Sequence, residues 1–388
     1  MAGAEANAFL TATELKSRGH TVGILHGEAT GRGESGWRET FSQCFALNNG
    51  HSSETTRAAI EGFRPDVVYV HKLADLAVIE ALVGSNRPLV RMVHDHDLYC
   101  MRSYKYNPFT RQICKRAASA YCVFPCGATL ARNRDGGLPF RWVSYLAKKK
   151  ELRLNRQFQR MVVATRYMRD ELVRNHFDRD KIEIHVPVPR ALETPRQSSF
   201  NNRNLILYTG QIIRGKGVDV LLESLAQVRV PFECIIFGEG SHRPYCVELC
   251  RKLGLNDRVQ LKGFVPREEL DQQYGDGSVA VMSSVWPEPF GSAGLEGMRY
   301  GLPVVAFDAG GISEWLIDSH NGFLVPWMDR AGFAARVEQL LRNKALGKQM
   351  GERGRKLLTQ KYTFTRYIDG LEKMFENVVL EARSQTHK

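Results

Sequence analysis

Residues 283–298 read SSVWPEPFGSAGLEGM and directly follow the apolar run Val279–Met282. The apolar run predicts a buried parallel strand. The two prolines around Glu288 fix φ and lack amide donors, so they hold this residue in a loop. From Ser292 onward small and apolar residues favour a helix, whose first amides would be free to bind an anion. The stretch therefore predicts a strand, loop and helix of a parallel α/β domain, with a ligand crevice where the strand ends.

Two carboxylates stand out in this stretch, Glu288 in the loop and Glu296 in the early turns of the helix. Such a pair can face one crevice at different depths. Carboxylates accept hydrogen bonds from hydroxyl groups, so the pair suits a sugar or a ribose. The alternative is that Glu288 caps the helix and Glu296 is a solvated helical residue.

The wider pattern resembles the retaining family-4 glycosyltransferases, glycosyl transferases group 1, which have the GT-B fold. The resemblance covers most of the C-terminal half and rests on EPFG at 288–291, GLE at 294–296, GLPVV at 301–305 and GG at 310–311. It implies two Rossmann-like parallel-sheet domains facing a cleft, a UDP- or GDP-sugar as donor, and no catalytic metal. It also implies that Glu288 holds the sugar and Glu296 the ribose, with further donor contacts from Phe290, Gly291, Ser292 and Leu295.

Composition and net charge restrict the number of domains, the partners and the compartment less closely than the motifs do. With 388 residues, 43% of them hydrophobic, the chain is long enough for two α/β domains. The net charge of +12 favours anionic partners such as nucleotide diphosphates, phospholipid headgroups or nucleic acid. Nucleic acid is not expected, because no stacking or finger motif accompanies the charge. No apolar stretch approaches the roughly 18 to 20 residues that span a bilayer, so we expect a cytoplasmic protein.

The predicted organisation is an N-terminal acceptor-side domain at 1–187, a linker at 188–203, a nucleotide-sugar domain at 204–362, and a C-terminal helix at 363–388 that crosses back to the first domain. The chain opens on a helical pattern with Gly3 at its start, and a strand follows at 21–25. Family members carry a strand and a glycine-rich turn before this helix. The resemblance therefore predicts an N-terminal sheet without its first strand, and it implies that Gly3 contacts the donor.

Apolar runs at 65–71 and 88–93 predict two further parallel strands, and the second ends at His94. A lone histidine in such a place is usually a satisfied residue of a polar turn. The resemblance implies instead that His94 contacts the donor sugar, with His96 as a weaker candidate. Asp95 and Asp97 formally give an Asp-x-Asp metal motif, but the resemblance assigns this place to the histidine.

A second ligand turn is predicted at 211–217, after the apolar strand 205–210. Its glycines allow a phosphate to approach the backbone, and a basic side chain there would neutralise a diphosphate leaving group. Lys216 matches the family lysine, whereas Gln211 stands where the family has an arginine, so Arg214 is the candidate for the missing charge. The resemblance also implies that the backbone of Phe264 and Val265 meets the nucleotide base.

Four of the eight cysteines fall within one short insertion, at Cys100, Cys114, Cys122 and Cys126. Four thiolates can hold a structural zinc, although the spacing is looser than that of paired CxxC motifs. The alternative is a set of reduced, partly buried cysteines, as a cytoplasmic chain of this length favours.

Residues 141–160 are strongly basic, and apolar residues from Trp142 to Phe158 interleave with the charges. This pattern predicts an amphipathic helix. Such a face can lie on an anionic membrane and bring the enzyme to a lipid-linked acceptor. The alternative is a solvated helix with an apolar stripe toward the core.

Together these features predict a metal-independent retaining glycosyltransferase that acts on a glycan or lipid-linked glycan, in the synthesis of cell-surface polysaccharide or glycolipid. Two other readings are a sugar-nucleotide-binding module without transfer activity and a sugar-nucleotide epimerase. The first would bind a sugar nucleotide without turnover. The second would leave the sugar attached to its nucleotide.

Overall fold

The computed structural model describes residues 3–28, 36–48, 50–107, 109–132, 140–196, 198–200 and 203–386. The chain forms two compact units. Unit 1 comprises Met1–Ser103, Lys115–Pro189 and Thr365–Lys388, and unit 2 comprises Tyr104–Cys114 and Arg190–Phe364. The sequence-based division placed all of 1–187 in one domain. The structure differs at Tyr104–Cys114, which belongs to unit 2.

The parallel strands of unit 1 form two sheets. One holds β1 (Gly23–His26) and β2 (Gln43–Ala46); the other has the order β3 (Val68–Val70), β4 (Leu89–Met92), β7 (Arg160–Val163) and β8 (Ile182–Ile184). Every residue of β4 is buried, as expected of a central parallel strand covered on both faces. Within the described residues no strand joins β2 or β1 to β3, so the sheet of this unit is interrupted there.

Seven helices of the described chain accompany these sheets: α1 (Gly3–Ser17), α2 (Trp37–Thr40), α3 (Ser52–Phe63), α4 (Leu76–Val83), α5 (Tyr145–Asn155), α6 (Arg166–Arg174) and α13 (Phe364–Thr386). Side-chain caps start three of them: the side chains of Asp75, Ser144 and Thr165 accept backbone amides of the first turns. Helix α13 packs on α1, where Arg18 Nη1 contacts Asp369 at 2.7 Å and Glu372 at 2.8 Å.

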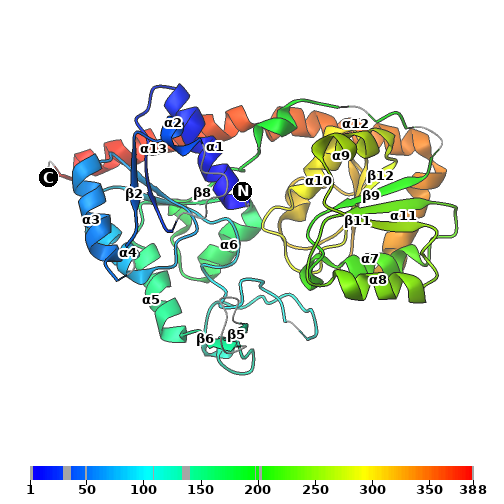
Figure 1. The fold of residues 1–388 in the computed structure, drawn as a ribbon, viewed down its shortest axis with the longest axis horizontal. Coiled ribbons are helices and arrows are strands. Elements are labelled where there is room, and N and C mark those ends of the chain that lie inside the picture. The colour runs from blue at the N-terminus through cyan, green and yellow to red at the C-terminus, as the bar shows by residue number, and fades with distance from the viewer. Residues whose placement is uncertain are drawn as a thin grey trace. The chain divides into compact units, whose positions relative to one another are not determined.

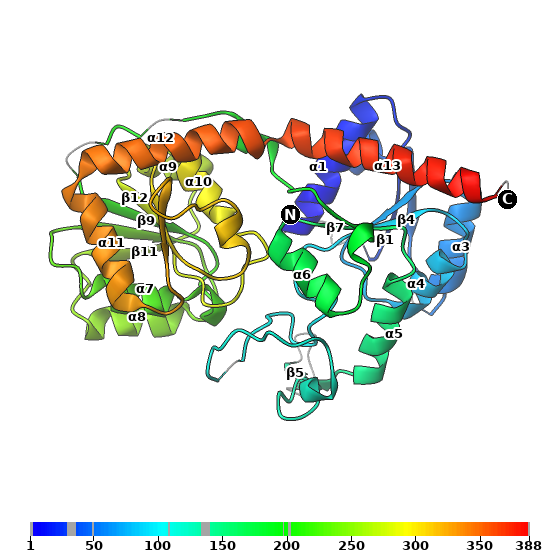
Figure 2. The same cartoon turned by 180° about the vertical axis from the view of Figure 1, so that it is seen from behind.

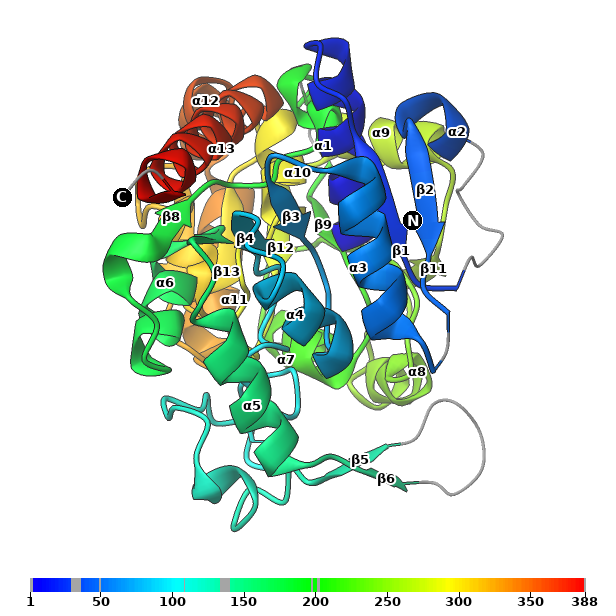
Figure 3. The ribbon, with the colours of Figure 1, turned by 90° about the vertical axis from the view of Figure 1, so that its left-hand side faces the viewer.

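The predicted single helix over 141–160 is wrong at its start. Strands β5 (Leu130–Arg132) and β6 (Phe140–Trp142) form an antiparallel hairpin, and α5 begins only at Tyr145. The side chain of Ser144 caps α5, which explains where the helix starts. Trp142 therefore lies in a strand, opposite Leu130, and the hairpin extends away from the sheets of unit 1 (Figure 3).

Unit 2 is a doubly wound α/β domain. Its six-stranded parallel sheet has the order β11 (Val259–Gly263), β10 (Glu233–Phe237), β9 (Leu205–Thr209), β12 (Val279–Met282), β13 (Val304–Phe307) and β14 (Gly322–Val325). Its helices are α7 (Val218–Leu225), α8 (Arg243–Lys252), α9 (Arg267–Asp276), α10 (Ala293–Arg299), α11 (Arg330–Arg342) and α12 (Lys344–Lys361). Helices α7 and α8 lie on one face of the sheet, and α9, α10 and α12 lie on the other (Figures 1 and 2).

The strand order of unit 2 reverses between β9 and β12. From β9 the chain moves outward through β10 to β11, then returns to β12 beside β9 and moves outward the other way. In open parallel sheets the loops at such a reversal separate and leave a crevice at the carboxyl ends of the strands. The two stretches that the sequence singles out, 211–217 and 283–298, follow these two strands, and the second runs into α10. In the described part of the chain, no helix is both long and apolar enough to cross a membrane.

Candidate active site

The backbone of Glu288 is fixed by a short parallel bridge to Gly310. The amide of Glu288 donates to the carbonyl of Ala309 at 3.0 Å, and the amide of Gly311 donates to the carbonyl of Glu288 at 2.7 Å. Gly310 has φ +71°, and a Cβ there would lie 2.5 Å from the carbonyl oxygen of Glu288. Only glycine fits this position without displacing the loop. The glycine pair at 310–311 is therefore part of the support of Glu288.

The carboxylate of Glu288 is buried, with 3% of the residue exposed, and three donors meet one of its oxygens. Lys216 Nζ donates to Oε1 at 2.7 Å and Trp286 Nε1 at 3.0 Å, and Ser284 Oγ donates to the same atom. Burial opposes ionisation, but the charge and hydrogen bonds of Lys216 outweigh it and lower the pKa of Glu288. No described residue donates to Oε2, so all three hydrogen bonds fall on one oxygen of the carboxylate.

The loop after β9 is joined to the loop after β12. The backbone amides of Val285 and Trp286 donate to the carbonyl of Gly215 at 2.9 and 3.0 Å. Gly217, which precedes α7, has φ +65°, and a Cβ there would lie 2.0 Å from the carbonyl oxygen of Ser283. The sequence predicted Lys216 and Glu288 as separate ligand residues. The structure brings them together across 72 positions of sequence.

Trp286 and Ser284 contact Glu288, and the sequence analysis did not single them out. Besides its hydrogen bond to Glu288, Trp286 carries Lys216 over its ring, with Nζ 5.0 Å from the centroid. Gly215 lets the ring pack close, because a Cβ there would lie 3.2 Å from it. The available signal was a tryptophan in a loop that follows a buried strand.

The other predicted donor residues of the turn at 211–217 have different surroundings. Gln211 is exposed, and its carbonyl accepts the hydroxyl of Tyr208 at 3.2 Å. Arg214 is exposed and begins the short 3₁₀ turn η4 (Arg214–Lys216) that carries Lys216. Both therefore lie on the same turn as Lys216, and neither contacts Glu288.

Glu296 lies in the first turns of α10, and two arginines already hold it. Arg299 Nη1 contacts Oε1 at 3.2 Å, and Arg267 Nη2 contacts the same oxygen. The Glu296 side chain is 14% exposed, and no described residue donates to Oε2. As at Glu288, the described cations meet only one oxygen of the carboxylate.

The remaining residues predicted to contact the donor lie near α10 and β11, where some are buried and others are exposed. Phe290 and Leu295 are buried, and the carbonyl of Phe290 accepts the indole N–H of Trp315 at 2.7 Å. The amides of Gly294 and Leu295 donate to the carbonyls of Gly291 and Ser292, so these two amides are not free for an anion as the sequence predicted. Phe264 is 82% exposed in the loop after β11, and Val265 is half-buried beside it.

In unit 1, His94 forms a pair with His71. His94 Nε2 lies 2.8 Å from His71 Nδ1, and the rings stack with centroids 5.1 Å apart. Burial lowers the pKa of His71 to about 3 and that of His94 to about 4, and the cations Lys72 and Arg91 add to the shift of His94. Both rings are therefore neutral near pH 7. His71 follows β3 as His94 follows β4, a parallel that the sequence analysis missed.

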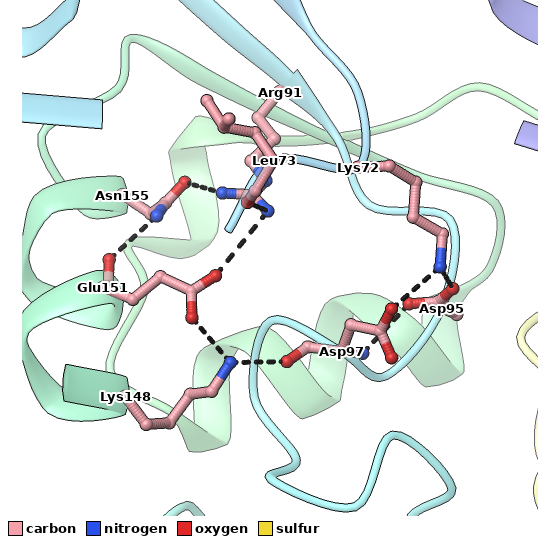
Figure 4. Close-up of polar contacts among 8 residues, drawn as sticks. All are labelled: Lys72, Leu73, Arg91, Asp95, Asp97, Lys148, Glu151 and Asn155. Carbon is pink, nitrogen blue, oxygen red and sulfur yellow. Dashed lines mark hydrogen bonds and ion pairs between the residues drawn. The ribbon is translucent and has the colours of Figure 1, made fainter. Parts of the chain in front are cut away.

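Charged side chains fix the loop that follows His94 (Figure 4). Lys72 Nζ pairs with Asp95 and, at 2.8 Å, with Asp97. Lys148 Nζ donates to the carbonyl of Asp97 at 2.7 Å and to Glu151 Oε2 at 2.6 Å. The two aspartates of the formal metal motif are thus engaged by lysine rather than left open.

The same network continues into the core beneath β4. Glu151 Oε1 lies 3.8 Å from Arg91 Nη2, and Arg91 also donates to Asn155 Oδ1 at 2.5 Å and to the carbonyl of Leu73 at 2.6 Å. Arg91, Glu151 and Asn155 are all buried (Figure 4). A buried network with every partner in place fixes one arrangement, so His94 stands on a rigid loop.

The structure also shows where three other predicted features lie. Gly3 is the exposed first residue of α1. His96, the weaker histidine candidate, is buried, with Nδ1 2.8 Å from the hydroxyl of Tyr99. The four insertion cysteines form no disulfide in the described chain, and Cys114 belongs to unit 2 while the others belong to unit 1. Within the described ranges no three His, Cys, Asp or Glu side chains gather as the ligands of a metal ion would.

The histidine pair predicts a loss of stability in acid. Because folding lowers both pKa values from 6.5, to about 3 and about 4, the unfolded chain binds more protons than the folded chain below pH 6.5. The free energy of unfolding should therefore fall with pH, by about 2 kcal/mol per histidine between pH 7 and 5. Urea unfolding of the wild type and of a His71→Phe/His94→Phe variant at both pH values measures it. Equal pH slopes in the two proteins would contradict the assignment.

Comparison with known proteins shows which family the chain resembles. Residues 1–186 match the family described as Glycosyltransferase Family 4, and residues 191–357 match Glycosyl transferases group 1. An alpha-D-kanosaminyltransferase of Streptomyces kanamyceticus is 30% identical over 194 residues, 49% of this chain and 50% of that protein. The lipopolysaccharide core biosynthesis glycosyltransferase LpsE of Rhizobium meliloti is 29% identical over 179 residues, 46% of this chain and 50% of that protein. The match thus spans about half the length of these curated relatives.

Solved structures share the fold over nearly the whole chain. HepE of Anabaena in complex with UDP has a TM-score of 0.74 at 16% identity, and the match covers 97% of this chain and 96% of that one. Sucrose-phosphate synthase of Thermosynechococcus elongatus has a TM-score of 0.68 at 15% identity, with 98% and 94% covered. Both have the two-domain GT-B architecture that the sequence resemblance implied. The chain belongs to the family-4 glycosyltransferases, glycosyl transferases group 1.

Proposed function

We propose that the protein is a retaining glycosyltransferase that moves a sugar from a nucleotide-diphosphate donor to a glycan or lipid-linked glycan. The observation that carries the proposal is the pairing of Lys216 with Glu288 at the strand-order reversal of unit 2. This pairing sets a cation for a diphosphate beside an ionised carboxylate oxygen for a sugar hydroxyl. HepE, also described in complex with UDP-glucose, supports a UDP-sugar as donor, with a GDP-sugar as the other choice.

In this mechanism the role of each residue follows from the charge that develops as the donor reacts. When the bond from the sugar to the diphosphate breaks, negative charge builds on the leaving phosphate. Lys216 and Arg214 would stabilise that charge, with the amides near Gly291 and Ser292. Glu288 would hold the sugar through Oε2, Glu296 the ribose, and neutral His94 would orient the sugar. The acceptor hydroxyl then attacks the same face of an oxocarbenium-like centre and gives its proton to the departing diphosphate, a route that needs neither a protein nucleophile nor a catalytic metal.

A donor screen tests the proposal. Purified protein is incubated with UDP-, GDP- and ADP-sugars and candidate glycan acceptors, and release of the nucleoside diphosphate is followed. We expect acceptor-dependent release with one donor class. Tight binding without release would instead indicate a sugar-nucleotide-binding module. A changed sugar that stays attached to its nucleotide would indicate an epimerase.

We also propose that the protein acts at the surface of an anionic membrane, in cell-surface polysaccharide or glycolipid synthesis. The structure restricts the surface that could serve, because Leu152, Leu154 and Phe158 of the predicted amphipathic helix are buried. The exposed apolar side chains gather instead on the hairpin and the first turn of α5. Leu130 and Trp142 are cross-strand neighbours, 54% and 72% exposed, and Leu146 is 75% exposed.

Basic residues accompany this hairpin surface, defined by Leu130, Trp142 and Leu146. Lys149 and Arg153 are exposed on α5 one and two turns beyond Leu146. Exposed apolar groups beside cations are the composition of segments that lie at the interface of anionic bilayers. This complementarity of charge and hydrophobicity favours a lipid surface over a protein partner.

The double variant Trp142→Ser/Leu146→Ser should bind anionic vesicles at least about tenfold more weakly, because two large apolar side chains no longer enter the interface. Co-sedimentation with phosphatidylglycerol–phosphatidylcholine vesicles measures this. The control is Leu380→Ser, since Leu380 is 63% exposed on α13, away from the hairpin in sequence. Equal vesicle binding by wild type and double variant would exclude the hairpin surface as the membrane contact.

A further inference from the structure

The segment Tyr104–Cys114 belongs to unit 2 although the chain on both sides of it belongs to unit 1. The segment folds back on itself through an antiparallel bridge between Tyr106 and Ile113. The amide of Cys114 donates to the carbonyl of Lys105 at 2.8 Å, which closes the base of the loop. Lys105 is 2% exposed. The segment is therefore an ordered part of the nucleotide-binding unit, inserted from elsewhere in the sequence.

Arg111 anchors the segment to helix α7. Arg111 Nη2 lies 2.5 Å from Asp219 Oδ2, and the two side chains are only 11% and 8% exposed. Asp219 lies in the first turn of α7, two residues after Gly217 of the predicted diphosphate turn. Its other oxygen, Oδ1, is buried and without a hydrogen bond in the described chain. Separating the two side chains would leave a buried charge without its main partner, which is unfavourable. The Arg111–Asp219 pair therefore holds the segment at this turn.

Tyr104 links the segment to Glu288 through Trp286. Its ring packs on Trp286 with centroids 5.5 Å apart and an interplanar angle of 39°. Trp286 in turn donates its indole N–H to Glu288 Oε1 at 3.0 Å. The orientation of the indole decides whether that hydrogen bond can form. Tyr104 therefore contacts the group that orients the catalytic carboxylate, without contacting that carboxylate itself.

We propose that Tyr104–Cys114 is a built-in component of the donor site, in which Tyr104 is a positioning residue for Glu288 acting through Trp286. The proposal rests on the proposed glycosyltransferase function and assigns a role to an insertion that its sequence did not reveal. Arg111 fixes where the segment lies, Tyr104 fixes the plane of Trp286, and Trp286 fixes the rotamer of Glu288. The effect belongs to the chemical step, because nucleotide contacts elsewhere do not pass through this chain of residues.

Tyr104→Ala should lower kcat about two- to tenfold, the size expected when one aromatic pair is lost, with little change in the Kd for the nucleoside diphosphate. Tyr104→Phe keeps the ring and should stay within about twofold of the wild type. Phe109→Ala is the matched control, because Phe109 lies in the same segment but is 81% exposed. In a Trp286→Phe background the indole N–H is absent, so Tyr104→Ala should have no further effect on kcat. An equal loss in both backgrounds would overturn the route through Trp286.

Tryptophan fluorescence gives a second readout that does not depend on turnover. Tyr104→Ala should shift the emission spectrum in the wild-type background but not in Trp286→Phe, and an unchanged spectrum would overturn the contact. If the wild type releases no nucleotide from any donor, the proposed function is wrong, while the fluorescence comparison still decides whether Tyr104 orders Trp286. If the wild type transfers sugar and Tyr104→Ala does so at the full rate, only the positioning role is wrong.

Discussion

Glu288→Ala is expected to lower the transfer rate by about a hundredfold or more while the Kd for the nucleoside diphosphate changes by less than about threefold. The free oxygen of Glu288 is the proposed contact to the sugar, and its loss removes an interaction that matters as charge develops at the reacting carbon. Single-turnover rates with the donor identified by the screen, and calorimetric titration with the nucleoside diphosphate, measure the two quantities.

Glu296→Ala is the matched control for this result. Its carboxylate is held by Arg267 and Arg299, as that of Glu288 is held by Lys216, so both variants remove a buried, paired carboxylate. The proposed ribose contact predicts about a tenfold loss of nucleotide affinity for Glu296→Ala. Equal losses of nucleotide affinity in the two variants would contradict the division of roles between the carboxylates.

Lys216→Met should give the second largest effect, a hundred- to thousandfold loss of transfer, because the proposed cation for the leaving diphosphate is removed. It should also lower the free energy of unfolding by about 3 kcal/mol, since Glu288, which is 3% exposed, is left as a buried charge without its cation. Rates of nucleotide release and urea unfolding measure the two effects.

The double variant Lys216→Met/Glu288→Gln separates catalysis from stability. A neutral glutamine no longer needs the lysine, so most of the lost stability should return, while transfer stays at or below the level of Lys216→Met because the carboxylate that contacts the sugar is also absent. Recovery of transfer together with stability would contradict the proposed roles of both residues.

The sequence predicted those features that local patterns encode. The apolar runs predicted β4, β9 and β12 to within a residue. Glu288, Lys216 and His94 lie at carboxyl ends of parallel strands, where such folds place ligand residues. The GT-B fold followed from the resemblance carried by the EPFG and GLE motifs.

Contacts between distant residues were not predictable in the same way. The Lys216–Glu288 pair joins residues 72 positions apart, and it depends on β9 and β12 being neighbours, which requires the strand order of the sheet. The Trp142 hairpin was missed because apolar and basic residues interleave in the strand much as in an amphipathic helix. The segment Tyr104–Cys114 was assigned to the wrong unit because nothing local marks the Arg111–Asp219 contact, which spans 108 positions.

Proton NMR of the anomeric signals during turnover tests the central claim most directly. With donor and acceptor present, we expect the donor signal to disappear as the nucleoside diphosphate is released. The first product signal should have the same anomeric configuration as the donor, and Glu288→Ala should abolish its appearance. A product of opposite configuration, an altered sugar still attached to its nucleotide, or a donor signal that does not change would each contradict a retaining glycosyltransferase built on Glu288 and Lys216.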